Sequence, residues 1–288
     1  MSDTKPTILV LGATGMLGNT VMRRFASRDC NVYGSARTDR LLRHLPEAVR
    51  DRIVVGVDVD DTDQLLRLFS RVKPSAVVNC VGIIKQLSVA NDALSAIPIN
   101  SLLSHRLAVL CAAASARLIH ISTDCVFSGN RGGYVEDDPA DAQDLYGRTK
   151  HLGEVDYENA VTLRTSIIGH ELGSSIGLLG WFLSSEGEVN GFRRAIFSGV
   201  PTIELSDIIH DQVIPRPGLR GVYHIAAEPI SKYELLQLVA KVYRKKITIV
   251  PDDRVIIDRS LNAERFRAAT GYQPPNWAAL IEKMYAFG

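Results

Sequence analysis

An apolar segment that runs directly into three spaced glycines constrains the fold of this 288-residue chain most strongly. Residues 7–11 are almost entirely apolar, as expected of a parallel strand that is buried on both faces. Gly12, Gly15 and Gly18 follow at once, and a helical pattern runs from residue 19 to 28. Glycines in that context permit a tight turn, let the backbone approach a pyrophosphate and allow close helix packing. The segment therefore predicts a dinucleotide-binding turn, with the helix N-terminus facing the phosphates.

The end of the second predicted strand, residues 31–36, indicates which dinucleotide binds. NAD-binding domains place an acidic residue there, on the adenosine ribose hydroxyls. This chain instead has Arg37, with Arg40 close by. A guanidinium suits a 2′-phosphate because it forms bidentate, charge-assisted hydrogen bonds. We therefore predict NADP(H) as the preferred cofactor and keep NAD(H) as the alternative, since Arg37 also fits a solvated loop.

Strand and helix patterns alternate through the first 165 residues. Repeats of this length predict a parallel sheet with right-handed crossovers, whose ligands bind at the carboxyl ends of the strands. We predict an α/β protein: a Rossmann-type doubly wound parallel sheet over residues 1–165, joined by a strand near 221–226. Residues 166–288 would form a smaller, discontinuous C-terminal substrate lobe. The patterns behind this prediction are strands at 53–57, 75–79, 117–122 and 160–165, and helices at 61–71 and 99–115.

Tyr146 and Lys150 are four residues apart, downstream of Thr123. At that spacing on a helix, both side chains project from one face, so the ammonium can lie beneath the phenol. A free tyrosine titrates at about pH 10, and a neighbouring cation favours the phenolate, drawing its pKa toward neutral pH. The Thr123 hydroxyl, at the end of an apolar strand, would hold the carbonyl oxygen that is protonated. Alone, the Tyr and Lys pair also fits a solvated helix face.

Several motifs together resemble the extended short-chain dehydrogenase/reductases, and more narrowly the dTDP-4-dehydrorhamnose reductase group of nucleotide-sugar enzymes. The resemblance spans most of the chain, and its motifs are specific within the first 170 residues. The motifs are Gly12-Ala13-Thr14-Gly15-Met16-Leu17-Gly18, Asn79-Cys80-Val81-Gly82, Asn100, Ser122-Thr123-Asp124-Cys125-Val126-Phe127-Ser128-Gly129, Leu145-Tyr146-Gly147-Arg148-Thr149-Lys150 with Gly153-Glu154, Leu163-Arg164-Thr165-Ser166 and Gly221-Val222-Tyr223-His224.

The resemblance implies a role for each matching residue. Tyr146 would be the proton donor, and Lys150 would hold the nicotinamide ribose. Thr123 would bind the reacting oxygen and Asn100 would support the proton relay, although the spacing of Asn100 alone predicts a helix cap or a surface residue. Cofactor contacts would come from Gly12, Thr14, Gly15, Met16, Leu17, Gly18, Arg37, Asp58, Val59, Cys80, Val81, Gly82, Lys150 and Thr165. Substrate contacts would come from Lys85, Asp124, Cys125, Arg193 and Arg194.

Two departures from the family pattern concern the substrate. These reductases commonly have a tyrosine after the Thr-Asp pair, whereas this chain has Cys125, so the sugar contact there must differ. Relatives that remove water use Thr-Asp-Glu, and Cys125 in place of that Glu argues against a dehydratase. A reactive thiol and a pocket-lining residue both stay open for Cys125. The second departure is the substrate lobe, where the match to the family is thin. Arg193 and Arg194 there either bind a nucleotide diphosphate or lie on a solvated or oligomer-forming surface.

The resemblance implies an NADP(H)-dependent reductase that transfers hydride to the 4-keto carbon of a nucleotide-linked deoxysugar. Two alternatives stay open. An epimerase of the same fold would show no net cofactor consumption, and a non-catalytic NADP-binding regulatory subunit would resemble the relative that regulates methionine adenosyltransferase. Retention of Thr123, Tyr146 and Lys150 favours an enzyme, because binding alone needs no proton donor.

The amino-acid composition argues against several kinds of binding partner. The 33 basic and 32 acidic residues leave a formal net charge of +1, which predicts neither a nucleic-acid partner nor a membrane surface. No apolar run reaches the ~18 residues of a membrane span. Cys30, Cys80, Cys111 and Cys125 lack C-x-x-C spacing, which argues against disulfides and zinc. We expect a cytoplasmic protein with a nucleotide-sugar substrate and no metal, and leave a homodimer open.

Overall fold

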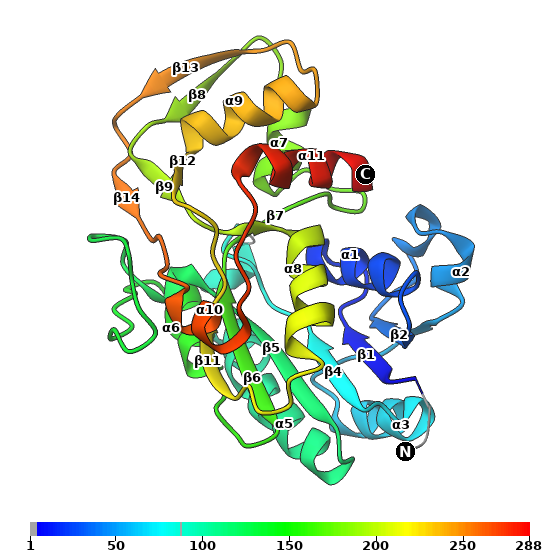
Figure 1. Cartoon of the computed structure of the whole chain (residues 1–288). Helices are drawn as coiled ribbons and strands as arrows, with labels where there is room; N and C mark the ends of the chain where they lie inside the picture. Colours follow the sequence, from blue (N-terminus) through cyan, green and yellow to red (C-terminus); the bar gives the residue numbers. More distant parts are fainter. Residues whose placement is uncertain (1–4, 87) are drawn as a thin grey trace.

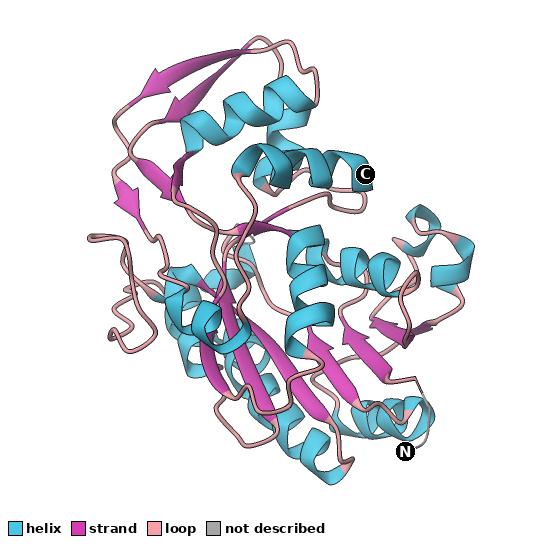
Figure 2. Ribbon diagram, in the orientation of Figure 1, coloured by secondary structure: helices cyan, strands magenta, loops and turns pink. Residues whose placement is uncertain are grey.

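The computed structural model describes residues 5–86 and 88–288 and has a seven-stranded parallel sheet at its centre (Figures 1 and 2). The strand order is β11-β6-β5-β4-β1-β2-β3, and each neighbouring pair runs parallel. This Rossmann-like α/β fold confirms the predicted fold class. The strands are β1 (Thr7–Leu11), β2 (Asn31–Ala36), β3 (Ile53–Val55), β4 (Ala76–Asn79), β5 (Arg117–Thr123), β6 (Ala160–Thr165) and β11 (Gly221–His224).

Helices cover both faces of this sheet because its strands are apolar on both sides. Ile8 and Val10 of β1 belong to one buried cluster, whereas Leu9 and Leu11 belong to another on the opposite face. The first cluster includes residues of α1 (Met16–Phe25) and α8 (Thr202–Ile208), and the second includes residues of α3 (Thr62–Val72) and α5 (Leu103–Ala113), as Figure 1 shows.

The glycine turn between β1 and α1 has the geometry that requires glycine. Gly12 has a φ of 79°, and a Cβ on Gly18 would lie 2.0 Å from the Gly12 carbonyl oxygen. Helix α1 begins at Met16, three residues before the predicted start, since the Asn19 amide already donates to the Gly15 carbonyl at 2.9 Å. The glycines therefore lie at the very start of the helix, where they bring its N-terminus close to β1.

The second half of the chain forms a smaller lobe beyond the carboxyl ends of the strands (Figure 1). Its short strands form three small sheets, β10-β7, β12-β9-β14 and β13-β8. The elements are β7 (Ile167–Ile168), α7 (Leu178–Ser184), β8 (Glu188–Phe192), β9 (Ala195–Phe197), β10 (Val200–Pro201), β12 (Ile230–Ser231), α9 (Lys232–Val242), β13 (Thr248–Asp252), β14 (Ile257–Asp258) and α11 (Trp277–Phe287). Helix α10 (Glu264–Thr270) lies instead beside β11 of the large sheet (Figure 1).

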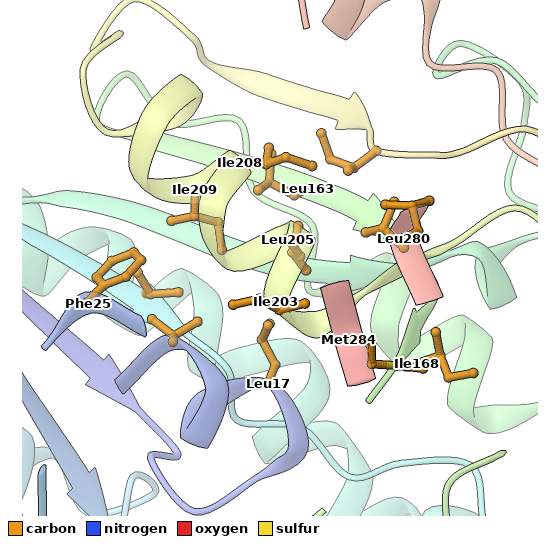
Figure 3. Close-up of a cluster of buried hydrophobic side chains, with 14 of the residues drawn as sticks. Leu17, Phe25, Leu163, Ile168, Ile203, Leu205, Ile208, Ile209, Leu280 and Met284 are labelled. Carbon is orange, nitrogen blue, oxygen red and sulfur yellow. The ribbon is translucent and has the colours of Figure 1, made fainter. Parts of the chain in front are cut away.

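The two parts of the chain share one core. In Figure 3, Leu17 of α1, Leu163 of β6, Leu205 of α8 and Met284 of α11 belong to the same buried cluster. The return of β11 to the large sheet agrees with the strand predicted near 221–226. No sequence pattern predicted that α8 would pack beside α1. The division of function between residues 1–165 and 166–288 stays a prediction.

A continuous helix, Ala93–Ala113, has the length and mean hydropathy, 1.3, to cross a membrane by those measures alone. It is a core helix of the domain, because Leu103, Leu107 and Cys111 are buried against the sheet. It comprises α4 (Ala93–Ala96), the π-helical turn η3 (Ile97–Leu102) and α5. The remaining short elements are η1 (Leu42–His44), α2 (Glu47–Arg50), η2 (Ser88–Asn91), η4 (Asp124–Val126), α6 (Leu145–Leu152) and η5 (Ile209–Val213).

Candidate active site

Thr123 ends β5 at the carboxyl edge of the sheet. Its hydroxyl accepts a hydrogen bond from the Cys125 amide and donates one to Asp124 Oδ1, both at 3.1 Å. The first of these bonds is the side-chain cap that starts η4. Burial raises the pKa of Asp124, against the opposing effect of the Thr123 hydrogen bond. The Thr123 hydroxyl is therefore fixed in position, with a buried carboxyl beside it.

Helix α6, which carries Tyr146, contacts η4, and the Thr123 side chain is close enough to influence the pKa of the phenol. Asp144 caps the helix, with Oδ1 accepting from the Gly147 amide at 2.9 Å. A Cβ on Gly147 would lie 2.3 Å from the carbonyl oxygen of Cys125. Glycine at this position lets the helix approach β5, and so lets the phenol reach the hydroxyl.

Burial raises the pKa of the Tyr146 phenol above its ordinary value, and the neighbouring Cys125 adds to the rise. Contact with the Thr123 hydroxyl acts in the opposite direction. Lys150 projects from the same helix, and its Nζ donates to the carbonyl oxygen of Ile121 at 2.7 Å. The lowered phenol pKa that the spacing predicted is not found in the chain itself, because burial is the largest influence on this phenol.

Lys150 is buried and lies beside a residue that was predicted to bind the cofactor. A Cβ on Gly82 would be 4.0 Å from Lys150 Nζ and 3.5 Å from Asn100 Oδ1. Burial lowers the pKa of Lys150 to about 8, and the carboxylate of Glu154 opposes that shift. The end of β4, the turn η3 and helix α6 thus bring Gly82, Asn100 and Lys150 together.

Asn100 is neither a helix cap nor a surface residue, in contrast to what its spacing alone predicted. It is 1% exposed, and its side chain pairs with the backbone of Ile83: Oδ1 accepts from the amide at 2.8 Å and Nδ2 donates to the carbonyl at 3.1 Å. It lies in the π-helical turn η3, a type of irregularity that is frequent at functional sites. Asn100 therefore fixes the loop that follows β4.

The N-terminus of α1 fits the pyrophosphate of a dinucleotide. Its N-cap, Gly15, has no side chain to satisfy the first amides, and the first helical turn carries no acidic residue. Free helix N-terminal amides bind anions. A Cβ on Gly12 would lie 3.0 Å from Val81 Cγ2, so the glycine turn directly adjoins the Cys80 to Gly82 segment. These predicted cofactor residues are brought together by the fold.

The other predicted cofactor residues lie around this turn. Arg37 and Arg40 are exposed just beyond β2. Asp58 follows β3 and accepts from the Asp60 amide at 3.0 Å, with Val59 partly buried beside it. Thr165 ends β6 in register with Thr123. Their roles stay predictions, as do those of Thr14, Met16 and Leu17 in the turn.

Basic side chains surround Asp124 and Cys125. Lys85 Nζ binds Asp144 Oδ2 at 2.7 Å. Arg259 Nε donates to the Phe127 carbonyl at 2.7 Å, and its charge favours the ionised form of Asp124. Lys232 acts on Asp124 in the same way. Sequence analysis missed Arg259 and Lys232, which belong to no motif and come from the distant smaller lobe.

The structure changes the interpretation of two predicted substrate-binding residues, Cys125 and Arg193. Burial raises the pKa of the Cys125 thiol to about 12, which favours a pocket-lining residue over a reactive thiolate. Arg193 lies on the turn after β8, where Nε donates to Asp253 Oδ1 at 2.8 Å, and Arg194 beside it is exposed. Arg193 would have to leave this ion pair to bind a diphosphate. Among the described residues no three His, Cys, Asp or Glu side chains are placed to hold a metal.

A family model described as the RmlD substrate binding domain matches residues 6–286. The chain belongs to this family. The motif-based resemblance is thereby confirmed. The dTDP-4-keto-6-deoxy-D-glucose reductase of Streptomyces niveus is 31% identical over 272 residues, which cover 86% of this chain and 83% of that protein. Methionine adenosyltransferase 2 subunit beta of Xenopus laevis is 25% identical over 248 residues, which cover 82% and 71%. The RmlD family thus holds nucleotide-sugar reductases and also a transferase subunit.

Two solved structures share the fold. The dTDP-4-dehydrorhamnose reductase of Bacillus anthracis, in complex with NADP, has a TM-score of 0.82, 19% identity and coverage of 100% of both chains. The Bordetella bronchiseptica enzyme WbmG, in complex with NAD and UDP, has a TM-score of 0.78, 18% identity and coverage of 99% of this chain and 95% of WbmG. The first of these structures contains NADP and the second contains NAD.

Proposed function

We propose that this chain is an NADP(H)-dependent reductase of a nucleotide-linked 4-keto deoxysugar. The observation that carries the proposal is the contact between the Tyr146 phenol and the Thr123 hydroxyl at the carboxyl edge of the sheet, with Lys150 buried beside Gly82. A proton donor, an oxygen-binding hydroxyl and a cation lie where a parallel sheet binds its ligands. A subunit kept only for binding has no need of this arrangement.

The chain's residues divide the reaction between them. NADPH, when bound, supplies the hydride that reaches C4 of the sugar. The amides at the start of α1 would hold its pyrophosphate, and Lys150 would hold its nicotinamide ribose. Thr123 holds the keto oxygen of the sugar so that it faces the phenol. Tyr146 then donates its proton to that oxygen as negative charge develops.

A proton donor must carry its proton when reduction begins. A phenol with a high pKa keeps its proton at neutral pH, so the donor is loaded before hydride transfer begins. The negative charge that develops on the C4 oxygen takes this proton. Orientation of the two reactants supplies much of the acceleration, and general acid catalysis adds roughly 10²–10⁴-fold.

The charges around the site favour an anionic substrate. Lys85, Lys232 and Arg259 all act on the Asp124 and Cys125 region. A diphosphate that links a sugar to a nucleoside matches these cations. The Streptomyces niveus relative, whose name gives a dTDP-linked keto-deoxysugar as substrate, agrees with this class. Arg37 favours NADPH over NADH.

The test is to mix the purified protein with NADPH and a dTDP-linked 4-keto-6-deoxyhexose, and separately with a UDP-linked one. NADPH absorbance and the sugar products are followed together, with Tyr146→Phe as the matched inactive protein. Stoichiometric NADPH loss with a reduced sugar supports the proposal and identifies the nucleotide. An isomerised sugar without NADPH loss would mean an epimerase. Tight NADPH binding with no turnover of either substrate would favour a regulatory subunit, as in the methionine adenosyltransferase relative.

A further inference from the structure

Two successive residues of β5 hold the side chains of Lys150 and Glu154. The carbonyl oxygen of Ile121 accepts from Lys150 Nζ at 2.7 Å, and the hydroxyl of Ser122 donates to Glu154 Oε1 at 2.7 Å. Gly153, the C-cap of α6, lies between the two. A Cβ on Gly153 would be 2.0 Å from the carbonyl oxygen of Asn100, so this turn is tightly packed. The ammonium of Lys150 and the carboxylate of Glu154 are therefore anchored to adjacent residues at the end of β5.

Glu154 is a buried and fully bonded carboxylate. Arg164 donates to it twice, from Nε to Oε1 at 2.7 Å and from Nη2 to Oε2 at 2.6 Å. His151 Nδ1 lies 3.1 Å from Oε2. The side chains of Glu154 and Arg164 are each 5% exposed. Burial would raise the pKa of Glu154, but the Arg164, His151 and Ser122 hydrogen bonds hold it at about 2. The carboxylate is therefore charged at every working pH.

We propose that Glu154 is the buried counter-charge of Lys150, a positioning residue that keeps the ammonium protonated and in place beside Gly82. Lys150 is 5% exposed and hydrogen-bonds a neutral carbonyl, an environment that disfavours a cation unless an anion is near. Glu154 is the group whose charge opposes that cost. The inference rests on the proposed function only in giving this ammonium a cofactor ribose to hold.

The other titratable groups in this part of the chain do not supply a negative charge that could balance the Lys150 ammonium. His120 on β5 is neutral, because burial, and next the charge of Lys150 itself, push its pKa well below the usual range. The Tyr146 phenol and the Cys80 thiol after β4 are protonated, since burial raises both pKa values. Arg164 on β6 is a cation. Glu154 is thus the negative charge that the described chain provides for Lys150.

Removal of the Glu154 carboxylate should shift the Lys150 pKa in a definite direction. The pKa of Lys150 is about 8, and a group needed as a cation stops working as the pH rises through its pKa. A nearby opposite charge shifts a pKa by roughly 1–3 units. Removing Glu154 therefore moves the loss of function to lower pH, and the unpaired Arg164 would move it further in the same direction.

The experiment follows the Lys150 titration directly, in protein labelled with carbon-13 at lysine Cε, with the Lys150 signal assigned by Lys150→Arg. In Glu154→Gln we expect the Lys150 pKa to fall by about one unit or more. The double variant Glu154→Gln/Arg164→Gln replaces the buried ion pair by neutral amides, which proteins often tolerate, and it should show the same direction. Glu154→Asp, which keeps the charge, and His151→Gln, whose side chain is half exposed, should stay near the wild type.

An unchanged Lys150 pKa in the double variant would overturn the proposal and leave the Glu154 and Arg164 pair with a purely structural role. The alkaline limb of the activity profile should move together with the NMR titration. The titration needs no substrate. A protein that turns over no nucleotide sugar but shows the shifted Lys150 pKa would therefore contradict the proposed function while leaving this inference intact.

Discussion

Gly147 and Cys125 approach so closely that a Cβ on the glycine would lie 2.3 Å from the cysteine carbonyl oxygen. The contact joins α6 to η4, and with them the candidate proton donor Tyr146 to Thr123. The glycine between Tyr146 and Lys150 is therefore what lets the helix come near enough to β5.

We predict that Gly147→Ala lowers kcat by at least about tenfold, because a displaced helix moves the phenol away from the reacting oxygen. Overpacking at such a site also costs about 1–3 kcal/mol of unfolding free energy. Steady-state kinetics and urea denaturation measure the two effects. Gly218→Ala is the matched control, since nothing lies within 4 Å of a Cβ there. Full activity in Gly147→Ala would mean that the contact does not position Tyr146.

Tyr146→Phe should abolish turnover while leaving NADPH affinity nearly unchanged. The phenol is the proton donor in the proposed mechanism, and removal of a general acid costs roughly 10²–10⁴-fold in rate. Kinetics together with fluorescence titration of NADPH separate chemistry from binding. Tyr157→Phe, a change at a 42% exposed tyrosine, should keep wild-type activity. An active Tyr146→Phe protein would remove the phenol from the mechanism.

Arg37→Asp should shift the cofactor preference from NADPH toward NADH. We propose that the exposed guanidinium beyond β2 pairs with the 2′-phosphate, whereas a carboxylate there would repel the phosphate and bind the ribose hydroxyls. The ratio of kcat/KM for the two cofactors is the measurement. Arg220→Asp, an exposed change at the amino end of β11, serves as the control. If selectivity stays the same, the 2′-phosphate is held elsewhere.

Asp207 joins α1, α8 and α11, and its contribution to stability should depend on pH. It receives hydrogen bonds from Arg24 Nε and Arg28 Nη2 at 2.7 Å, and Lys283 Nζ lies 2.7 Å away. Although burial raises its pKa, these cations lower it to about 2. A folded pKa below the unfolded value of about 3.9 gives stability at neutral pH that is lost as the pH falls toward 2.

We therefore expect Asp207→Asn to lower the free energy of unfolding by about 2 kcal/mol at pH 7, with the difference shrinking as the pH falls below 4. Denaturant titrations at several pH values give this difference. Asp29→Asn removes an exposed ion pair with Lys5 and should change little. A pH-independent difference between Asp207→Asn and wild type would contradict the account.

The large sheet could be predicted because short sequence segments specify its strands and turns. Apolar runs set β1 and β4, and the spaced glycines set the turn that joins β1 to α1. The return of α8 to the face of α1 depends on contacts such as the 3.1 Å hydrogen bond between Thr20 and Thr202, residues far apart in the chain. No periodicity within either segment predicts that contact.

In the candidate site, too, local spacing predicted some features, whereas others depend on contacts between distant parts of the chain. Helical spacing correctly put Tyr146 and Lys150 on one helix, but it could not predict that the ammonium would choose the carbonyl of Ile121, since that depends on how α6 crosses β5. Arg259 reaches Phe127 from 132 residues away and carries no motif. The roles of the site residues stay predictions until variants are measured.

The most direct test of the central claim follows a single turnover of the preferred 4-keto nucleotide sugar. The cofactor is NADPH that carries deuterium at the transferable position of its nicotinamide ring. We predict that deuterium appears at C4 of the reduced sugar in wild-type protein and that Tyr146→Phe gives none on the same timescale. Mass spectrometry and NMR of the sugar read both outcomes. Reduction without deuterium at C4, or equal transfer by Tyr146→Phe, would contradict hydride transfer assisted by this phenol.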